Sequence, residues 1–246
     1  MASFAVLGLI PARGGSKGIR NKNLAPLCGR PLLAYTADAV RESARLTRTV
    51  VSTNDLAIAE AARALGLDVP FARPDTLSAD DTLMLPVVQH ALRAARESGF
   101  QPDAVVLLQP TSPLRRGEHI DGAIALLESS HAESVVSVVE VPHQFNPVSV
   151  MRLDGETLRP FLDEGSSASP ASLKGMITRR QDKPRVLARN GPAVLVTRAA
   201  TIDAGSLYGD DCRPFVMEPE DSLDVDTPWD LAMIEGILLR RRAARA

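Results

Sequence analysis

Cysteine is scarce in this chain of 246 residues, and the two that it contains, Cys28 and Cys212, lie in unrelated contexts. The sequence therefore offers neither a disulfide framework nor the CxxC spacing of a metal site. We expect both thiols to be reduced.

Long apolar runs and an excess of charge are also missing. No apolar run approaches the roughly 20 residues that a membrane span requires, and the opening stretch FAVLGLI has no basic segment before it. We therefore expect no signal peptide, no membrane partner and a cytoplasmic protein. The net charge of −2 argues against a nucleic-acid partner, so any phosphate binding must depend on a local cluster of cations.

Internal repeats and low-complexity tracts are absent, whereas apolar residues make up 45% of the chain and charged residues 24%. These values are ordinary for a folded globular protein. The length suits one large α/β domain, and we predict a single domain over residues 1–246.

Short, β-branched apolar segments alternate with segments of helical period. Strands are predicted at 4–10, 48–53, 104–109, 134–141 and 193–197, and helices at 31–43, 55–66, 82–98 and 118–129. The alternation predicts an α/β fold whose mostly parallel, doubly wound sheet carries helices on both faces. A last helix is expected after Asp226, because Thr227 can cap it, Pro228 suits its first turn and Asp230 completes a capping-box spacing.

The strand and helix pattern is interrupted over residues 142–191. An Asp-Gly pair between apolar stretches indicates a short hairpin, and a segment rich in Ser, Pro and Gly follows it. We interpret residues 142–191 as an inserted hairpin subregion. Its apolar residues are too many for an isolated ribbon to bury, so the hairpin needs a partner surface or must fold back onto its own domain.

Three polar loops follow predicted strands: PARGGSKG at 11–18, STND at 52–55 and QPTSPLRR at 109–116. Ligands of such sheets bind outside the carboxyl ends of the strands, so the three loops should converge on one crevice. The first loop holds the strongest signal, because residues 9–23 contain four cations and three glycines but no acid. Glycine backbone and clustered cations suit a polyphosphate, although a tight turn with solvated cations is the alternative.

Two familiar phosphate-binding motifs do not match this loop. Lys17 precedes Gly18, and Ile19 comes next, which breaks the Walker A order; the glycines also lack the GxGxxG spacing.

A second signal is the pair Asp224 and Asp226, which an extended chain would present on one face. Two carboxylates beside a polyphosphate suit Mg²⁺, whereas the acid enrichment of a helix start would explain only Asp226 well.

The blocks IPARGGSKGIRNKNL, VVSTND, LLQPTSPLR, RRQDKP and SLDVDTPWDL occur in this order over residues 5–235. This set resembles the acylneuraminate cytidylyltransferases, also called CMP-sialic acid synthetases, and their legionaminate and pseudaminate relatives. The resemblance implies a Rossmann-like nucleotidyltransferase fold. It also implies transfer of CMP from CTP to the anomeric hydroxyl of an acidic nine-carbon (nonulosonic) sugar, with release of pyrophosphate.

The resemblance assigns roles in the nucleotide site by motif position. Arg13 and Lys17 would contact the CTP phosphates as catalytic residues, Lys22 and Asn23 would complete the nucleotide pocket, Arg73 would lie near the cytosine and Thr82 near the ribose. Asp224 and Asp226 would be catalytic as ligands of Mg²⁺.

The resemblance also assigns an acceptor site and an assembly. Gln109 would contact the sugar acid, and Arg180 and Gln181 would lie near the acceptor sugar, whose carboxylate an arginine can bind. Residues 142–191 would act as a dimerisation arm of a homodimer in which each arm helps to close the other subunit's sugar site.

The chain departs from the family at residues 190–195, where NGPAVL replaces the common NGAIYI. The lost tyrosine leaves the acceptor open, so 3-deoxy-manno-octulosonate or another acidic sugar remains an alternative. A non-catalytic nucleotide sensor is a second alternative, but a sensor would have no use for Gln109, Arg180 and the acidic pair together. No side chain stands out as a general base, because the four histidines are scattered.

Overall fold

The computed structural model describes residues 4–16, 18–162, 177 and 179–244. It divides into two compact units, unit 1 (Met1–Val138 and Arg189–Ala246) and unit 2 (Val139–Ala188). The strands are β1 Val6–Pro11, β2 Pro26–Leu27, β3 Arg30–Pro31, β4 Arg48–Ser52, β5 Ala104–Leu107, β6 Ser134–Glu140, β7 Met151–Asp154, β8 Thr157–Pro160, β9 Leu187–Arg189, β10 Leu195–Arg198 and β11 Cys212–Val216. The α-helices are α1 Leu33–Glu42, α2 Leu56–Ala64, α3 Met84–Glu97, α4 Gly117–Ser130, α5 Ala199–Asp203 and α6 Pro228–Ala243. The 3₁₀ helices are η1 Lys22–Leu24, η2 Asp75–Leu77, η3 Pro147–Ser149, η5 Arg180–Asp182 and η6 Pro219–Ser222.

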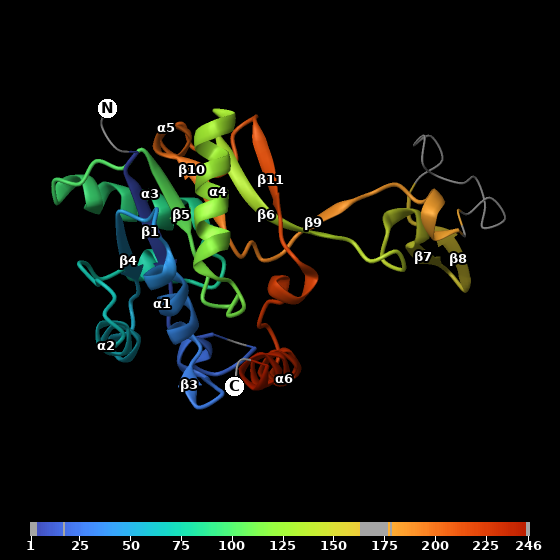
Figure 1. The fold of residues 1–246 in the computed structure, drawn as a ribbon, viewed down its shortest axis with the longest axis horizontal. Coiled ribbons are helices and arrows are strands. Elements are labelled where there is room, and N and C mark those ends of the chain that lie inside the picture. Colours follow the sequence, from blue (N-terminus) through green and yellow to red (C-terminus); the bar gives the residue numbers. More distant parts are fainter. Residues whose placement is uncertain (1–3, 17, 163–176, 178, 245–246) are drawn as a thin grey trace. The chain divides into compact units, whose positions relative to one another are not determined.

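Unit 1 is built on a mixed sheet with the strand order β11-β6-β10-β5-β1-β4, and β9 also pairs with β6 (Figure 1). β1 runs parallel to both β4 and β5, and β11 runs parallel to β6. β10 is antiparallel to both of its neighbours, β5 and β6. The predicted α/β fold with a mostly parallel sheet is confirmed. The sequence pattern gave no sign of the reversed direction of β10, and β11 and α5 were not predicted.

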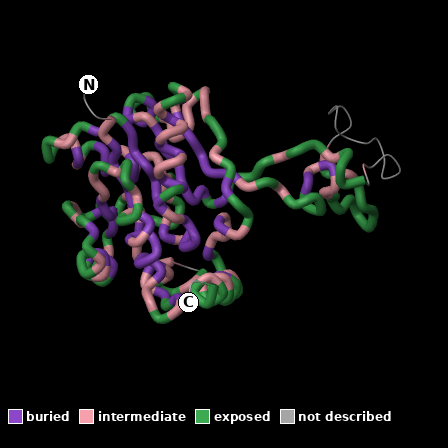
Figure 2. Tube along the Cα trace, viewed as in Figure 1, coloured by how far each residue is buried: buried purple, intermediate pink, exposed green. Residues whose placement is uncertain are grey.

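The central strands are apolar on both sides because helices cover both faces of the sheet. Alternate residues of each strand join different core clusters, one packed with α1, α2 and α4 and the other with α3 and α5. In β1 and β5 the first cluster contains Val6, Ile10, Ala104 and Val106, and the second contains Leu7, Leu9, Val105 and Leu107. Figure 2 shows the centre of the sheet as mostly buried, with exposed residues on the helices and loops around it.

Helix α6 begins as its sequence predicts. Thr227 is the N-cap, its side chain accepts from Asp230 N, and the Asp230 side chain accepts in return from Thr227 N. Pro228 occupies the first turn, and the arginines lie in the last turn. Within the described residues, no helix is both long enough and apolar enough to cross a membrane.

Unit 2 contains the predicted hairpin. β7 and β8 pair antiparallel from Met151 with Pro160 to Asp154 with Thr157, and Gly155 in the turn has φ 58°. This left-handed conformation suits glycine, which explains the Asp-Gly signal. The hairpin and the residues that flank it leave several large apolar side chains exposed, namely Phe145, Met151, Leu153, Leu158 and Phe161.

Candidate active site

The loop after β1 is held by two other segments. Gly14 N donates to Oδ1 of Asn54 at 3.1 Å, and Nδ2 of Asn23 donates to the backbone oxygen of Arg13 at 3.0 Å. A Cβ at position 14 would lie 2.8 Å from Oδ2 of Asp55, the N-cap of α2. Glycine therefore lets the loop backbone approach the start of this helix.

Carboxylates from distant segments pair with two cations of this loop. Nη2 of Arg13 lies 2.7 Å from Oδ1 of Asp80. Nζ of Lys22 lies 3.0 Å from Oδ1 of Asp226 and donates to the backbone oxygen of Val225 at 2.8 Å. The third predicted cation, Lys17, lies outside the described residues. The loop has no acid of its own, but tertiary contacts bring acids to it.

The basic loop and the acidic segment touch through their backbones as well. A Cβ at Gly18 would lie 2.7 Å from the backbone oxygen of Asp226. Together with the Lys22 contacts, this places the two strongest sequence signals, about two hundred positions apart, at one place in the fold. The first loop and the segment that carries the acidic pair therefore lie side by side in unit 1.

Asp224 is the more buried member of the acidic pair. Its Oδ1 accepts from Oγ of Ser112 at 3.1 Å, and Val225 behind it is fully buried and donates its N–H to the backbone oxygen of Thr111 at 2.8 Å. Burial raises the pKa of Asp224, and the nearby Asp226 carboxylate acts in the same direction, while hydrogen bonds and Lys22 oppose both effects. Among the described residues, no group of three or more His, Cys, Asp or Glu side chains could hold a metal.

A cavity of about 400 Å³ lies at the carboxyl end of β5. Gln109 lines it and donates from Nε2 to the backbone oxygen of Gly191 at 3.3 Å. The other lining residues are Met84, Leu107, Arg189, Gly191, Pro192, Leu195, Leu207 and Tyr208. A cavity that combines apolar side chains with an amide, a guanidinium and a phenol hydroxyl can hold a polar small molecule.

Sequence reasoning missed two polar residues of this cavity. The guanidinium of Arg189 lies 5.6 Å from the ring centre of Tyr208 and donates from Nη1 to the tyrosine hydroxyl at 2.8 Å. Tyr208 is one of only two tyrosines in the chain, and Arg189 directly precedes the NGP block. Val194, where the family has its tyrosine, is fully buried in the core.

Arg73 is only 4% exposed, and its guanidinium contacts the last residue of β4. Its Nε donates to Oγ of Ser52 at 3.0 Å, and its Nη2 donates to the backbone oxygen of the same residue at 2.5 Å. Burial, assisted by Arg13, lowers the pKa of Arg73 to about 10. Thr82 lies in the turn after Asp80, where its N–H donates to the backbone oxygen of Ala79 at 3.2 Å. The roles of Arg73 at the cytosine and Thr82 at the ribose stay predictions.

Arg180 and Gln181 belong to unit 2, where both are exposed in η5. Their predicted role beside the acceptor sugar also stays a prediction.

Two histidines serve packing, because the ring of His90 lies edge-on to Phe71 at 5.0 Å and His119 is buried beside Arg116. His131 follows α4, and His143 is exposed in unit 2.

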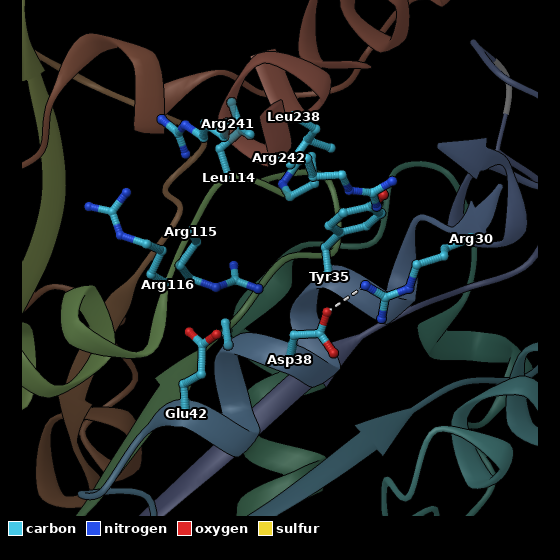
Figure 3. Close-up of a pocket in the computed structure, with 12 residues that line it drawn as sticks. Arg30, Tyr35, Asp38, Glu42, Leu114, Arg115, Arg116, Leu238, Arg241 and Arg242 are labelled. Carbon is cyan, nitrogen blue, oxygen red and sulfur yellow. Dashed lines mark hydrogen bonds and ion pairs between the residues drawn. The ribbon is translucent and has the colours of Figure 1, made fainter. Parts of the chain in front are cut away.

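A second cavity, of about 200 Å³, lies between α1, α6 and the loop after β5 (Figure 3). Arg30 pairs there with Asp38 at 2.7 Å. Arg115 and Arg116, adjacent in the chain, extend in opposite directions (Figure 3). Arg116 contacts the buried carboxylate of Asp221 at 3.0 Å. Arg115 is buried, and sequence reasoning did not single it out.

Comparison with known proteins matches residues 7–156 to the family model described as cytidylyltransferase. A CMP-N,N'-diacetyllegionaminic acid synthase of Legionella pneumophila is 31% identical over 95% of this chain and 96% of its own length. An N-acylneuraminate cytidylyltransferase of Escherichia coli is 29% identical over 93% of this chain, and this chain spans about half of it (51%).

The fold is also similar to that of solved structures. A CMP:2-keto-3-deoxy-manno-octonic acid synthetase, solved in complex with CTP, superposes with a TM-score of 0.67 and covers 96% of this chain and 99% of its own. Its 16% identity shows a shared fold alone. The family model covers more than half of this chain, and a full-length relative is more than 30% identical to it. The chain therefore belongs to the cytidylyltransferase family.

Proposed function

We propose that this enzyme transfers CMP from CTP to the anomeric hydroxyl of a nonulosonic acid. The contact between the glycine-rich basic loop and the acidic pair, through Lys22 and Asp226, is the observation that carries the proposal. It joins cations for a triphosphate to carboxylates for a divalent metal. The protein's relatives include a CMP-N,N'-diacetyllegionaminic acid synthase and an N-acylneuraminate cytidylyltransferase. The cavity beside Gln109 supplies room for the acceptor.

In the proposed reaction, the anomeric oxygen of the sugar attacks the α-phosphorus of CTP. The new O–P bond forms as the bond between the α-phosphorus and the bridging oxygen to the β-phosphate breaks, so pyrophosphate leaves and the hydroxyl proton is released. Arg13 and Lys17 would stabilise the phosphate charge, and Lys22 and Asn23 would hold the loop around the nucleotide. In unit 1, His90 and His119 are held by packing and hydrogen bonds away from a role as general base.

The acidic pair fits Mg²⁺. Asp224 and Asp226 offer hard oxygen ligands. Burial raises the pKa of Asp224 and repulsion from Asp226 adds to the shift, so a second cation beside Lys22 would stabilise the charged pair. When bound, Mg²⁺ would neutralise charge on the phosphates. Asp224→Asn should therefore remove Mg²⁺-dependent activity while leaving the fold intact. Full activity with an unchanged metal requirement would exclude Asp224 as a ligand.

The identity of the acceptor sugar is tested with a panel of acidic sugars. Pyrophosphate release is measured with CTP, Mg²⁺ and N-acetylneuraminate, N,N'-diacetyllegionaminate or 3-deoxy-manno-octulosonate, as relative kcat/KM. We expect a nonulosonic acid to be preferred. Preference for the octulosonate would identify the alternative acidic-sugar enzyme. CTP binding without pyrophosphate from any acceptor would support the sensor.

We further propose that the protein is a homodimer that works in the cytoplasm. The exposed apolar side chains on and beside the unit 2 hairpin support the dimer, because five large ones lie within residues 145–161. Both cysteines are free, which agrees with a reducing compartment.

A further inference from the structure

Arg115 is a buried cation whose hydrogen-bond acceptors are all neutral, and the nearby carboxylate of Asp224 is the negative charge that favours its charged form. It is 3% exposed, and it donates from Nη1 to the backbone oxygens of Gln109 at 3.0 Å and Ala193 at 2.8 Å. Its Nη2 donates to Oγ1 of Thr36 at 2.7 Å. Burying a guanidinium without a contacting carboxylate is costly, so a fold that retains one needs a reason for it.

Two acceptors of Arg115, the backbone oxygens of Gln109 and Ala193, belong to the two segments that form opposite walls of the cavity beside Gln109. Gln109 lines that cavity with its side chain, and Ala193 directly follows Gly191 and Pro192, which line it too. These residues come from segments more than eighty positions apart, next to the antiparallel strands β5 and β10. One guanidinium nitrogen thus fixes the separation of the two walls. The bond to Thr36 anchors the same guanidinium to α1.

The loop from Gln109 to Arg115 also holds the acidic pair. The backbone oxygen of Thr111 accepts from Val225 N at 2.8 Å, and Oγ of Ser112 donates to Asp224 at 3.1 Å. The placement of the Asp224 carboxylate therefore depends directly on this loop, and that of Asp226 depends on it only through the backbone of Val225. Arg115 closes the loop on itself through its bond to the Gln109 carbonyl.

Arg115 makes none of the described contacts of the first loop. These contacts go to Ser52, Asn54, Asn23, Asp80 and the segment around Asp226. Only the last of these is shared with the loop that Arg115 closes. A disturbance at Arg115 should thus reach the acceptor cavity and the metal carboxylates before it reaches the CTP phosphates.

We propose that Arg115 is a positioning residue of the transfer reaction, which holds the acceptor cavity and the acidic pair in register with each other. The inference rests on the proposed function. Arginine suits the task because its planar fork reaches three acceptors in fixed directions, whereas lysine presents a single nitrogen. The neighbouring Arg116 differs, since it pairs with Glu118 and Asp221 and anchors the surface of unit 1.

The test compares Arg115→Met and Arg115→Lys with the wild-type enzyme. For Arg115→Met we expect the acceptor KM and the Mg²⁺ concentration for half-maximal rate to rise about tenfold, the scale of one lost charge-assisted hydrogen bond. The Kd for CTP, measured by calorimetry without acceptor, should stay within about twofold, because the first loop keeps its contacts. Arg115→Lys should recover part of the acceptor KM.

Two further variants keep the result interpretable. Thr36→Val removes one acceptor from α1 without touching the loop and should raise the acceptor KM several-fold even if Arg115→Met does not fold. Arg198→Met is the matched control, since Arg198 also donates to backbone oxygens, those of Ala132 at 2.7 Å and Leu127 at 3.0 Å, away from the site. Arg198→Met should lower the melting temperature and leave the acceptor KM and the Mg²⁺ concentration for half-maximal rate unchanged.

Two outcomes would overturn the inference. If Arg115 were merely structural, its variants would lose active protein and thermal stability at unchanged acceptor KM and Mg²⁺ requirement, as Arg198→Met does. If it served the nucleotide, the CTP Kd would rise with the acceptor KM. Failure of the proposed function gives a different result, because the wild-type enzyme itself would then turn over no acceptor.

Discussion

The carboxylate of Asp80 lies 2.7 Å from the guanidinium of Arg13. An acidic side chain of the protein is therefore paired with the cation that is expected to bind the CTP phosphates. Both side chains are partly exposed, at 31% for Arg13 and 41% for Asp80. A triphosphate must compete with this carboxylate for Arg13, since both are anions that a guanidinium binds in the same way.

Replacing Asp80 with asparagine should therefore tighten CTP binding. An exposed ion pair contributes about 0.2–1 kcal/mol, which corresponds to a Kd lowered by up to about fivefold. Calorimetry at low salt measures the change, and it should shrink at high salt. Asp75→Asn removes the same charge from the same segment and serves as control. Weaker CTP binding by Asp80→Asn would mean that Asp80 positions Arg13 rather than competes for it.

Replacing Gly18 with alanine should separate the basic loop from the acidic segment. The new Cβ would lie 2.7 Å from the Asp226 backbone oxygen, and a backbone atom cannot move aside cheaply. We expect kcat/KM to fall about tenfold or more, as small displacements at a reacting centre do. Gly236→Ala in α6, where no atom lies within 4 Å of a new Cβ, should instead raise the free energy of unfolding by roughly 0.5–1 kcal/mol at unchanged activity.

Folding stability should depend on pH through His119. Burial, with Arg116 next in size, lowers the pKa of His119 in the folded protein, and its Nδ1 already accepts from Arg116 N at 3.1 Å. The unfolded chain therefore binds a proton more readily, so the contribution of His119 to stability is complete above about pH 6.5 and is lost as the pH falls through the lowered folded pKa.

Urea unfolding between pH 5 and 8 checks this dependence. His119→Gln should flatten the loss of stability below pH 6.5, although His90, whose pKa burial also lowers, retains its own part. The same change at exposed His143 should leave the profile as in the wild type. A profile that His119→Gln does not alter would place the acid sensitivity elsewhere.

Charged residues on the unit 2 hairpin should disrupt the proposed dimer. Phe161 is 58% exposed and Leu153 is 73% exposed, so glutamate at both positions costs little folding stability within unit 2. Light scattering at micromolar concentration should show monomers that still bind CTP but turn over poorly. Leu56→Glu, at an 82% exposed site of unit 1, is the control. A wild-type monomer with full activity would contradict the dimer.

The sequence by itself determined the features that depend on residues near one another in the chain. The helical and strand periods predicted the α/β fold, Thr227 and Asp230 predicted the start of α6, and Asp154-Gly155 predicted the β7–β8 turn. In each case the physical cause is local. Side-chain periods, caps and turns involve partners only a few positions away, so they can be read without knowing the fold.

Only the tertiary structure decided the features that depend on distant partners. The pairing of Arg13 with Asp80 and of Lys22 with Asp226 joins segments 67 and 204 positions apart, and no local pattern encodes such distances. The direction of β10 and the Arg189–Tyr208 contact in the cavity are of the same kind. Arg115 shows the reason most plainly, because its burial and its three acceptors exist only once β5, β10 and α1 have packed together.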